Sequence, residues 1–181
     1  MKIIAIGGEP GTGKSSLMKS LMAILGTQTI NNTEKLVPYT IIENSKNIIV
    51  LGRYDGEGYA QGTDRMSMAC QPNVVSFLNN NKFDVVLFEG DRLFNQSFLE
   101  HCNKYYDLSI FLLKTNDEIK TQRYEERNSD QNETWLKGRK KKISNICDNM
   151  ELKWITSLLR NNDMNDQLSN IEFILEKLNE S

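Results

Sequence analysis

Residues 8–15, Gly-Glu-Pro-Gly-Thr-Gly-Lys-Ser, constrain the fold of this chain more than any other segment. Their spacing is GxxxxGK[ST], and they lie between an apolar run at 2–6 and a stretch at 16–25 with apolar residues at helical spacing. Glycines let consecutive backbone N–H groups point inward, and the N-terminus of the following helix adds partial positive charge. The segment therefore predicts a loop that binds the phosphates of a nucleoside triphosphate.

Two side chains of this loop have expected roles. Lys14 is placed to reach the β- and γ-phosphates, and the Ser15 hydroxyl is placed as a ligand for Mg²⁺. The alternative is a chance glycine turn before a helix. The GKS register and the strand, loop and helix context weigh against that alternative.

The bulk properties indicate one ordinary domain spanning residues 1–181. The net charge is −2 and 25% of residues are charged, so no overall basic excess indicates a nucleic-acid partner, although a local patch is compatible with these values. Cys70, Cys102 and Cys147 form no CxxC pair, so we expect neither zinc nor a disulfide framework, and a reducing cytoplasm fits. The chain starts directly with a strand and has no long apolar run, so we expect no membrane association.

Alternating strand-like and helix-like segments predict an α/β fold with a doubly wound, mostly parallel sheet. Apolar runs at 39–43 and 47–51, joined by polar residues, predict an antiparallel hairpin. In such a sheet, ligands bind beyond the carboxyl ends of the strands. The further elements that we expect are a helix at 72–79, strands at 83–88 and 108–113, helices at 93–103 and 117–127, a short strand at 154–159 and a final helix.

The tetrad Glu89-Gly90-Asp91-Arg92 follows the second buried strand. A carboxylate at the end of a strand beside a phosphate loop is expected to position the metal or the acceptor, and both Glu89 and Asp91 qualify. Arg92 is a candidate for binding a phosphate or the acceptor. The alternative is a strand-end turn whose charges are simply solvated.

The loop from Gly52 to Arg65 is dense in charge. Asp55, just past a strand, is expected to accept or orient the acceptor proton. The candidates for binding the acceptor are Arg53, Asp64 and Arg65. A loop with surface ion pairs is the alternative, and the choice among the carboxylates for the base is left open.

Cationic residues gather in the second half of the chain. Arg123 and Arg127 lie one helical turn apart, and Lys137-Gly138-Arg139-Lys140-Lys141-Lys142 contains five cations. This pattern predicts a lid that closes over the transferred phosphate, or a nucleic-acid patch; a solvated helix face is the alternative. Residues 160–163 are expected either to contact the nucleotide base or to cap the last helix through Asp163.

The phosphate loop, the strand-end EGDR and the arginine-rich segment together resemble small P-loop kinases of the nucleoside monophosphate kinase type. The resemblance implies a P-loop NTPase three-layer sandwich with a helical, basic lid at about 123–142, and ATP and Mg²⁺ as cofactors. Glu89 and Ser15 become candidate metal ligands, and Arg123, Arg127 and Arg139 candidate lid residues. The implied ATP-binding residues are Gly8, Gly11, Thr12, Gly13, Lys14, Ser15 and Ser16.

The segments LGRYDGEGYAQGTDRMSMA and ETWLKGRKKKISN make the chain similar to phage-encoded kinases that phosphorylate 5-hydroxymethyluracil in DNA. That narrower resemblance implies hydroxymethyluracil-containing DNA as the acceptor, DNA contacts at 137–142 and a location in the host cytoplasm. Kinase activity on free nucleoside monophosphates is the alternative within the same class.

Two alternatives belong to other classes. A GTPase-like switch would share the phosphate loop and the DxxG pattern at 55–58, but the guanine-specifying NKxD is absent after the third buried strand, where the chain reads Lys-Thr-Asn-Asp. A non-catalytic nucleotide-binding module is the other alternative, and the intact Lys14, Ser15 and Glu89 argue against it. The sequence does not indicate an oligomeric state.

Overall fold

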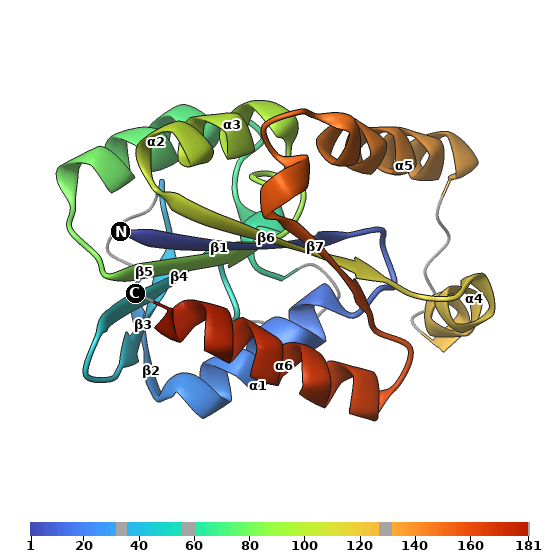
Figure 1. Cartoon of the computed structure of the whole chain (residues 1–181), viewed down its shortest axis with the longest axis horizontal. Coiled ribbons are helices and arrows are strands. Elements are labelled where there is room, and N and C mark those ends of the chain that lie inside the picture. Colours follow the sequence, from blue (N-terminus) through green and yellow to red (C-terminus); the bar gives the residue numbers. More distant parts are fainter. Residues whose placement is uncertain (32–35, 56–60, 127–131, 181) are drawn as a thin grey trace.

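The structure, a computed structural model, describes residues 1–31, 36–55, 61–126 and 132–180. Within them a seven-stranded sheet has the order β2-β3-β4-β5-β1-β6-β7 (Figure 1). The strands are β1 (Lys2–Gly8), β2 (Thr27–Asn31), β3 (Tyr39–Glu43), β4 (Asn47–Leu51), β5 (Val85–Glu89), β6 (Asp107–Lys114) and β7 (Thr156–Arg160). The α-helices are α1 (Lys14–Leu25), α2 (Gln71–Asn80), α3 (Gln96–Tyr105), α4 (Asp117–Glu126), α5 (Glu133–Asp148) and α6 (Met164–Asn179).

The five strands from β4 to β7 in the sheet order are parallel, and β3 runs antiparallel to both β2 and β4. Helices α1 and α6 cover one face of the sheet, and α2, α3 and α5 cover the other (Figure 1). This arrangement confirms the α/β P-loop fold with a mostly parallel, doubly wound sheet in three layers.

The central strands are apolar throughout because both of their faces are covered. In β1, Ile3 and Ala5 pack into the cluster beneath α2, α3 and α5, whereas Ile4 and Ile6 pack against α1 and α6. All four side chains are fully buried. A strand with polar residues on one face could not occupy this position, which is why β1 and its neighbour β5 lie at the centre of the sheet.

Several bounds differ from the expected ones. The sheet gains β2, which pairs antiparallel with β3 and adds a third strand to the expected hairpin. Helix α3 begins only at Gln96, because the side chain of Asn95 caps it by accepting a hydrogen bond from the backbone N–H of Phe98 at 3.2 Å. A short 3₁₀ turn, η2 (Lys153–Ile155), precedes β7 and delays the start of that strand. A second 3₁₀ turn, η1 (Thr63–Arg65), lies before α2.

None of the helices in the part of the chain that the structure describes is long and apolar enough to span a bilayer.

Candidate active site

The phosphate loop leaves the carboxyl end of β1 at the centre of the sheet and enters α1 at Lys14. Gly13 immediately precedes the helix with φ 87° and ψ 16°, a left-handed conformation that glycine adopts without strain. A Cβ at this position would also collide with the side-chain amide of Asn161. Gly13 is the N-cap residue of α1, and as a glycine it has no side chain that could cap the first backbone N–H groups of the helix. A helix start of this kind suits an anion.

The Lys14 ammonium lies over its own loop. Its Nζ donates to the carbonyl oxygens of Gly8 and Glu9, each at 2.9 Å. Ser16, in the first turn of the helix, donates to the side chain of Gln167 on α6 at 3.3 Å. The phosphate contacts expected for these residues stay predictions.

Glu89 ends β5 and is 1% exposed. Its Oε1 accepts hydrogen bonds from the hydroxyls of Ser15 at 3.1 Å and Tyr54 at 3.4 Å. Burial raises the pKa of Glu89 to about 7, while nearby Lys14 opposes the shift. The structure thus brings Ser15 and Glu89 together, as expected from their positions at two strand ends.

Sequence reasoning missed Tyr54. The pattern drew attention to its charged neighbours Arg53 and Asp55, yet the hydroxyl of Tyr54 is the group that reaches Glu89. Burial, followed by the charge of Glu89, raises the pKa of Tyr54 well above its usual value, so this hydroxyl stays protonated and donates. The only available signal was its place between two charged residues at the end of a strand.

Gly62 makes this approach possible. It has φ 62°, and a Cβ there would collide with the carboxylate of Glu89. Its backbone pairs with Arg53, whose N–H donates to the Gly62 carbonyl at 3.0 Å and whose carbonyl accepts from the Gly62 N–H at 2.9 Å. The backbone of Arg53 therefore joins the two ends of the loop between residues 53 and 62.

The charged residues of this loop differ in exposure, since Asp55 and Arg65 are exposed and Asp64 is half-buried. Asp55 forms an ion pair with Arg65 at 2.7 Å on the partly exposed rim. Asp64 lies deeper, and its Oδ1 accepts from the backbone N–H of Asp91 at 2.6 Å. Burial, and then the charge of Asp91, raises the pKa of Asp64, while Lys14 and Arg92 oppose the shift. Asp64 therefore lies within the electrostatic reach of Lys14, as Glu89 does.

Two cationic side chains of α5 contact Asp91. Arg139 pairs with the Asp91 carboxylate at 3.1 Å, and the Lys142 ammonium donates to the Asp91 carbonyl at 2.7 Å. The Arg139 guanidinium also lies 4.9 Å from the ring centroid of Trp135. Arg92 turns its Nε to the Met66 carbonyl at 3.4 Å. The structure thus brings Asp91, Arg92 and Arg139 to one place, and Lys142 is a member that the pattern did not single out from its basic run.

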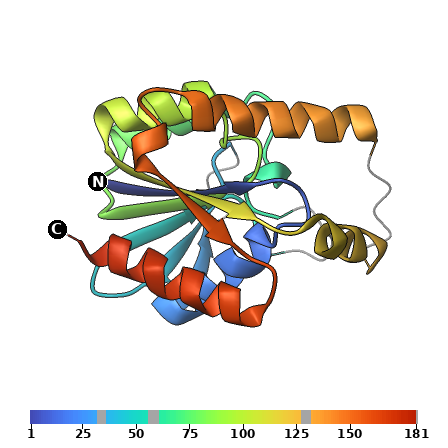
Figure 2. The same cartoon turned by 45° about the vertical axis from the view of Figure 1, so that its right-hand side comes forward.

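The expected lid segment contains helical parts on both sides of residues 127–131. Arg123 lies on α4 and donates to the carbonyls of Gly11 and Asn162, each at 2.9 Å, so it rests on the phosphate loop and on the turn before α6. Arg127 lies outside the described residues, as do residues 56–58 of the DxxG pattern. Figure 2 shows α4 and α5 on either side of the end of β1.

In the turn before α6, Asp163 caps the helix by accepting from the backbone N–H of Asp166 at 2.9 Å, as the second of the two sequence interpretations expected.

A family match decides the class of this site. The family described as P-loop Nucleotide Kinase3 matches residues 1–161. The chain belongs to this family. The chain is therefore a P-loop nucleotide kinase, an ATP-dependent phosphotransferase, and the GTPase-like switch and the non-catalytic module are set aside. The match does not identify the acceptor.

This P-loop kinase is similar to several solved structures. A gluconokinase from Sinorhizobium meliloti 1021 is 13% identical, with 98% of this chain and 95% of that chain covered and a TM-score of 0.47. A shikimate kinase from Bacteroides thetaiotaomicron is 12% identical, with 97% of each chain covered and a TM-score of 0.48. An uncharacterized protein from Eubacterium ventriosum ATCC 27560 is 15% identical with the same coverage and score. Such values assign no acceptor to this chain, and no curated protein matches it.

Proposed function

We propose that this kinase transfers the γ-phosphate of ATP to the hydroxymethyl group of 5-hydroxymethyluracil in DNA. The observation that carries the proposal is the division of α5 into two cationic faces. Arg139 and Lys142 face the candidate site at Asp91, whereas Lys137, Lys140 and Lys141 are exposed. An acceptor within a polymer needs contacts at the reacting group and also along the backbone, and exposed lysines provide the second kind.

The proposed donor site presents oxygen groups that suit Mg²⁺·ATP. Ser15 and Glu89 present a hydroxyl and a carboxylate 3.1 Å apart, and oxygen ligands of this kind suit Mg²⁺. The fit is supported by the raised pKa of Glu89, because a buried carboxyl whose charge is disfavoured is stabilised by a neighbouring cation. We propose that Ser15 and Glu89 hold the ion, which when bound neutralises charge on the phosphates.

We propose that groups of the protein itself make the remaining contacts with ATP. Lys14 exchanges its two loop carbonyls for phosphate oxygens when ATP arrives. The backbone N–H groups at the start of α1 bind the same phosphates, because that helix end attracts anions. Gly8, Gly11, Thr12, Gly13 and Ser16 complete the proposed ATP-binding set.

The acceptor hydroxyl needs a carboxylate that takes or orients its proton. Asp55 stays a candidate, but its carboxylate is engaged by Arg65 on the rim. Asp64 is favoured by its lower exposure, by its hydrogen bond with the backbone N–H of Asp91 and by its raised pKa. We therefore assign the orienting role to Asp64 and acceptor binding to Arg53, Arg65, Asp91 and Arg92.

A free nucleoside monophosphate is the second candidate acceptor. It is favoured by the cations Arg92 and Arg139, because arginines beside the transfer site suit an acceptor phosphate. In that case these two side chains would exchange Met66 and Asp91 for the acceptor. As lid residues, Arg123, Arg127 and Arg139 serve either acceptor.

One experiment tests the choice. ATP labelled at the γ-position is offered with a panel of free nucleotides, with DNA that contains 5-hydroxymethyluracil, and with the same DNA that contains thymine instead. We expect label in the hydroxymethyluracil polymer and none in the thymine polymer. Label confined to free nucleotides would contradict the DNA proposal and support the second candidate.

A further inference from the structure

The outer side of the phosphate loop is held at consecutive residues by groups from outside the loop. The Glu9 carboxylate pairs with the Lys120 ammonium of α4 at 2.9 Å. The carbonyl of Pro10 accepts a hydrogen bond from the hydroxyl of Tyr124, one helical turn further along α4, at 2.7 Å. Helix α4 therefore contacts the loop through two side chains that lie on the same face of the helix.

The next two residues of the loop are held in the same way. The Gly11 carbonyl accepts from the guanidinium of Arg123 at 2.9 Å, and the Thr12 carbonyl accepts from the side-chain amide of Asn161 at 2.7 Å. Asn161 is fixed in turn by Asn170 of α6, whose amide donates to it at 3.3 Å. Residues 9–12 thus each have an outside partner.

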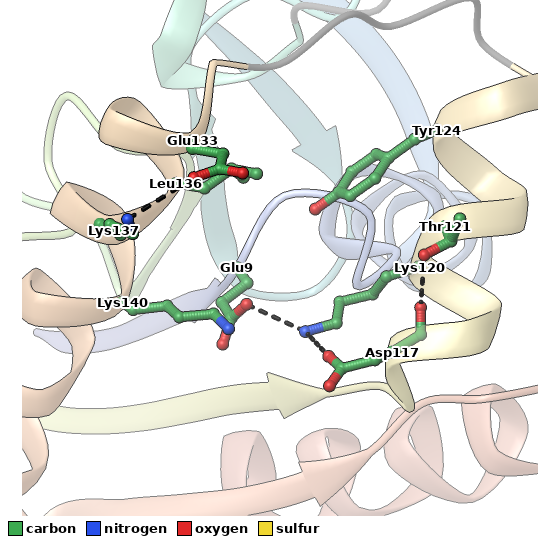
Figure 3. Close-up of a pocket in the computed structure, with 9 residues that line it drawn as sticks. All are labelled: Glu9, Asp117, Lys120, Thr121, Tyr124, Glu133, Leu136, Lys137 and Lys140. Carbon is green, nitrogen blue, oxygen red and sulfur yellow. Dashed lines mark hydrogen bonds and ion pairs between the residues drawn. The ribbon is translucent and has the colours of Figure 1, made fainter.

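Lys120 is well suited to hold the loop. Its side chain is only 10% exposed, and its ammonium also pairs with Asp117 at 2.7 Å (Figure 3). It lies at the wall of a cavity of about 300 Å³ that Glu9, α4 and α5 line. The Lys120–Glu9 pair, whose side chains are 10% and 27% exposed, is screened less by solvent than a fully exposed pair, so its geometry is held more firmly.

These contacts have a direct consequence for the inner side of the loop. A carbonyl that is held outward leaves the backbone N–H groups of the loop free to converge on a phosphate. A loop that contains Gly8, Gly11 and Gly13 would otherwise sample many backbone conformations. Only the fraction of molecules with the loop in the competent conformation binds ATP, and the apparent dissociation constant rises as that fraction falls.

We propose that Lys120 and Tyr124 are positioning residues that hold the phosphate loop in its nucleotide-binding conformation before ATP arrives. The inference goes beyond the proposed function, since it depends on the nucleotide site alone and holds for either acceptor. Their assigned role runs through Glu9 and Pro10, the two loop residues that they hold.

The test measures the dissociation constant of a fluorescent ATP analogue with Mg²⁺ for Tyr124→Phe and Lys120→Met. We expect each variant to bind about three- to tenfold more weakly, the effect of removing one hydrogen bond or ion pair. The KM for ATP should rise by the same factor, while kcat at saturating ATP stays close to wild type, because bound ATP restores the loop. A purely structural role would instead lower the melting temperature and the active fraction and leave KM unchanged.

Matched controls and a rescue complete the test. Tyr105→Phe and Lys177→Met change an exposed tyrosine and an ion-paired lysine away from the loop, and both should bind the analogue as wild type does. Lys120→Arg keeps the charge and should recover most of the affinity. If Lys120→Met fails to fold, the near-isosteric Tyr124→Phe still decides. Dissociation constants for Tyr124→Phe and Lys120→Met equal to those of the controls would overturn the proposal.

Discussion

The hydroxyl of Ser15 donates to the carboxylate of Glu89 across 3.1 Å, which joins the start of α1 to the end of β5. The two residues are 74 positions apart in the sequence and meet because β1 and β5 are neighbouring parallel strands, with Ile6 paired to Glu89 in the register. Parallel neighbours bring their carboxyl ends to one edge of the sheet, so a loop after one strand faces a side chain that ends the other. The proposed metal site follows from this register.

The first prediction concerns Lys14. Lys14→Ala should lower the rate of phosphoryl transfer by at least about 10²-fold, because the ammonium is expected to stabilise phosphate charge during transfer. The fold should tolerate the change, since the Lys14 ammonium donates to two carbonyls of its own loop and takes no part in the apolar core. Single-turnover kinetics with a thermal melt measure both effects. Retained turnover would contradict the proposed phosphate contact.

The second prediction separates the two candidate bases. Asp64→Asn should reduce kcat by about 10²-fold or more while ATP affinity changes little, because the orienting carboxylate acts on the acceptor. Asp55→Asn, which removes a rim ion pair, should reduce kcat much less. Steady-state kinetics with saturating ATP compare the two. The opposite order of effects would return the role to Asp55.

The third prediction concerns the pH dependence of stability without Mg²⁺. Burial raises the pKa of Glu89 from 4.5 to about 7, so between these values the folded state holds a proton that the unfolded state has released. Stability that depends on this proton is present at low pH and is lost as pH rises through about 7. Glu89→Gln carries no such proton, so its free energy of unfolding should rise relative to wild type by up to about 3 kcal/mol between pH 5 and pH 8.

Urea melts in EDTA at several pH values measure that difference. A gap between Glu89→Gln and wild type that does not change with pH would show that Glu89 titrates with its ordinary pKa.

The fourth prediction uses a pair of glycines. Gly62→Ala should destabilise the protein by about 1–3 kcal/mol, because φ is 62° and the added Cβ collides with the Glu89 carboxylate. Gly138 lies on the solvent-exposed surface of α5, away from the helix ends, and an added Cβ there meets no described atom within 4 Å. Gly138→Ala should therefore stabilise the protein by about 0.5–1 kcal/mol. Chemical denaturation measures both. Equal changes in the free energy of unfolding of the two variants would mean that the loop at Gly62 accommodates an added Cβ without strain.

The fifth prediction concerns the exposed lysines of α5. Replacing Lys140 and Lys141 with Gln should weaken binding to single-stranded DNA and reduce the slope of log K against log salt by about 0.7 for each phosphate that these lysines neutralise in the wild type. Lys19→Gln, an exposed lysine on α1, is the control. Fluorescence anisotropy at several salt concentrations measures the slope. An unchanged slope would remove α5 from the proposed DNA path.

Much of the fold was predictable from local pattern. The apolar runs of the central strands and the GxxxxGK[ST] loop predict a parallel sheet with a phosphate site, because a strand buried on both faces must be apolar throughout. Strand β2 was not predictable, since Thr27–Asn31 is mostly polar and is held at the sheet edge by its pairing with β3. The start of α3 likewise depended on a cap at Asn95, which propensity alone does not locate.

The sequence by itself determined the nucleotide loop, the strand-end acid and the class of fold, because each is encoded within a few adjacent residues. Only the tertiary structure decided which side chains around them meet. The hydroxyl of Tyr54 reaches Glu89 because Gly62 leaves room, and half-buried Asp64 contacts the backbone of Asp91 while Asp55 pairs with Arg65 on the rim. Lys120 and Tyr124 reach the outer side of the phosphate loop. Such contacts depend on strand register and helix packing between segments distant in the chain, which no local pattern specifies.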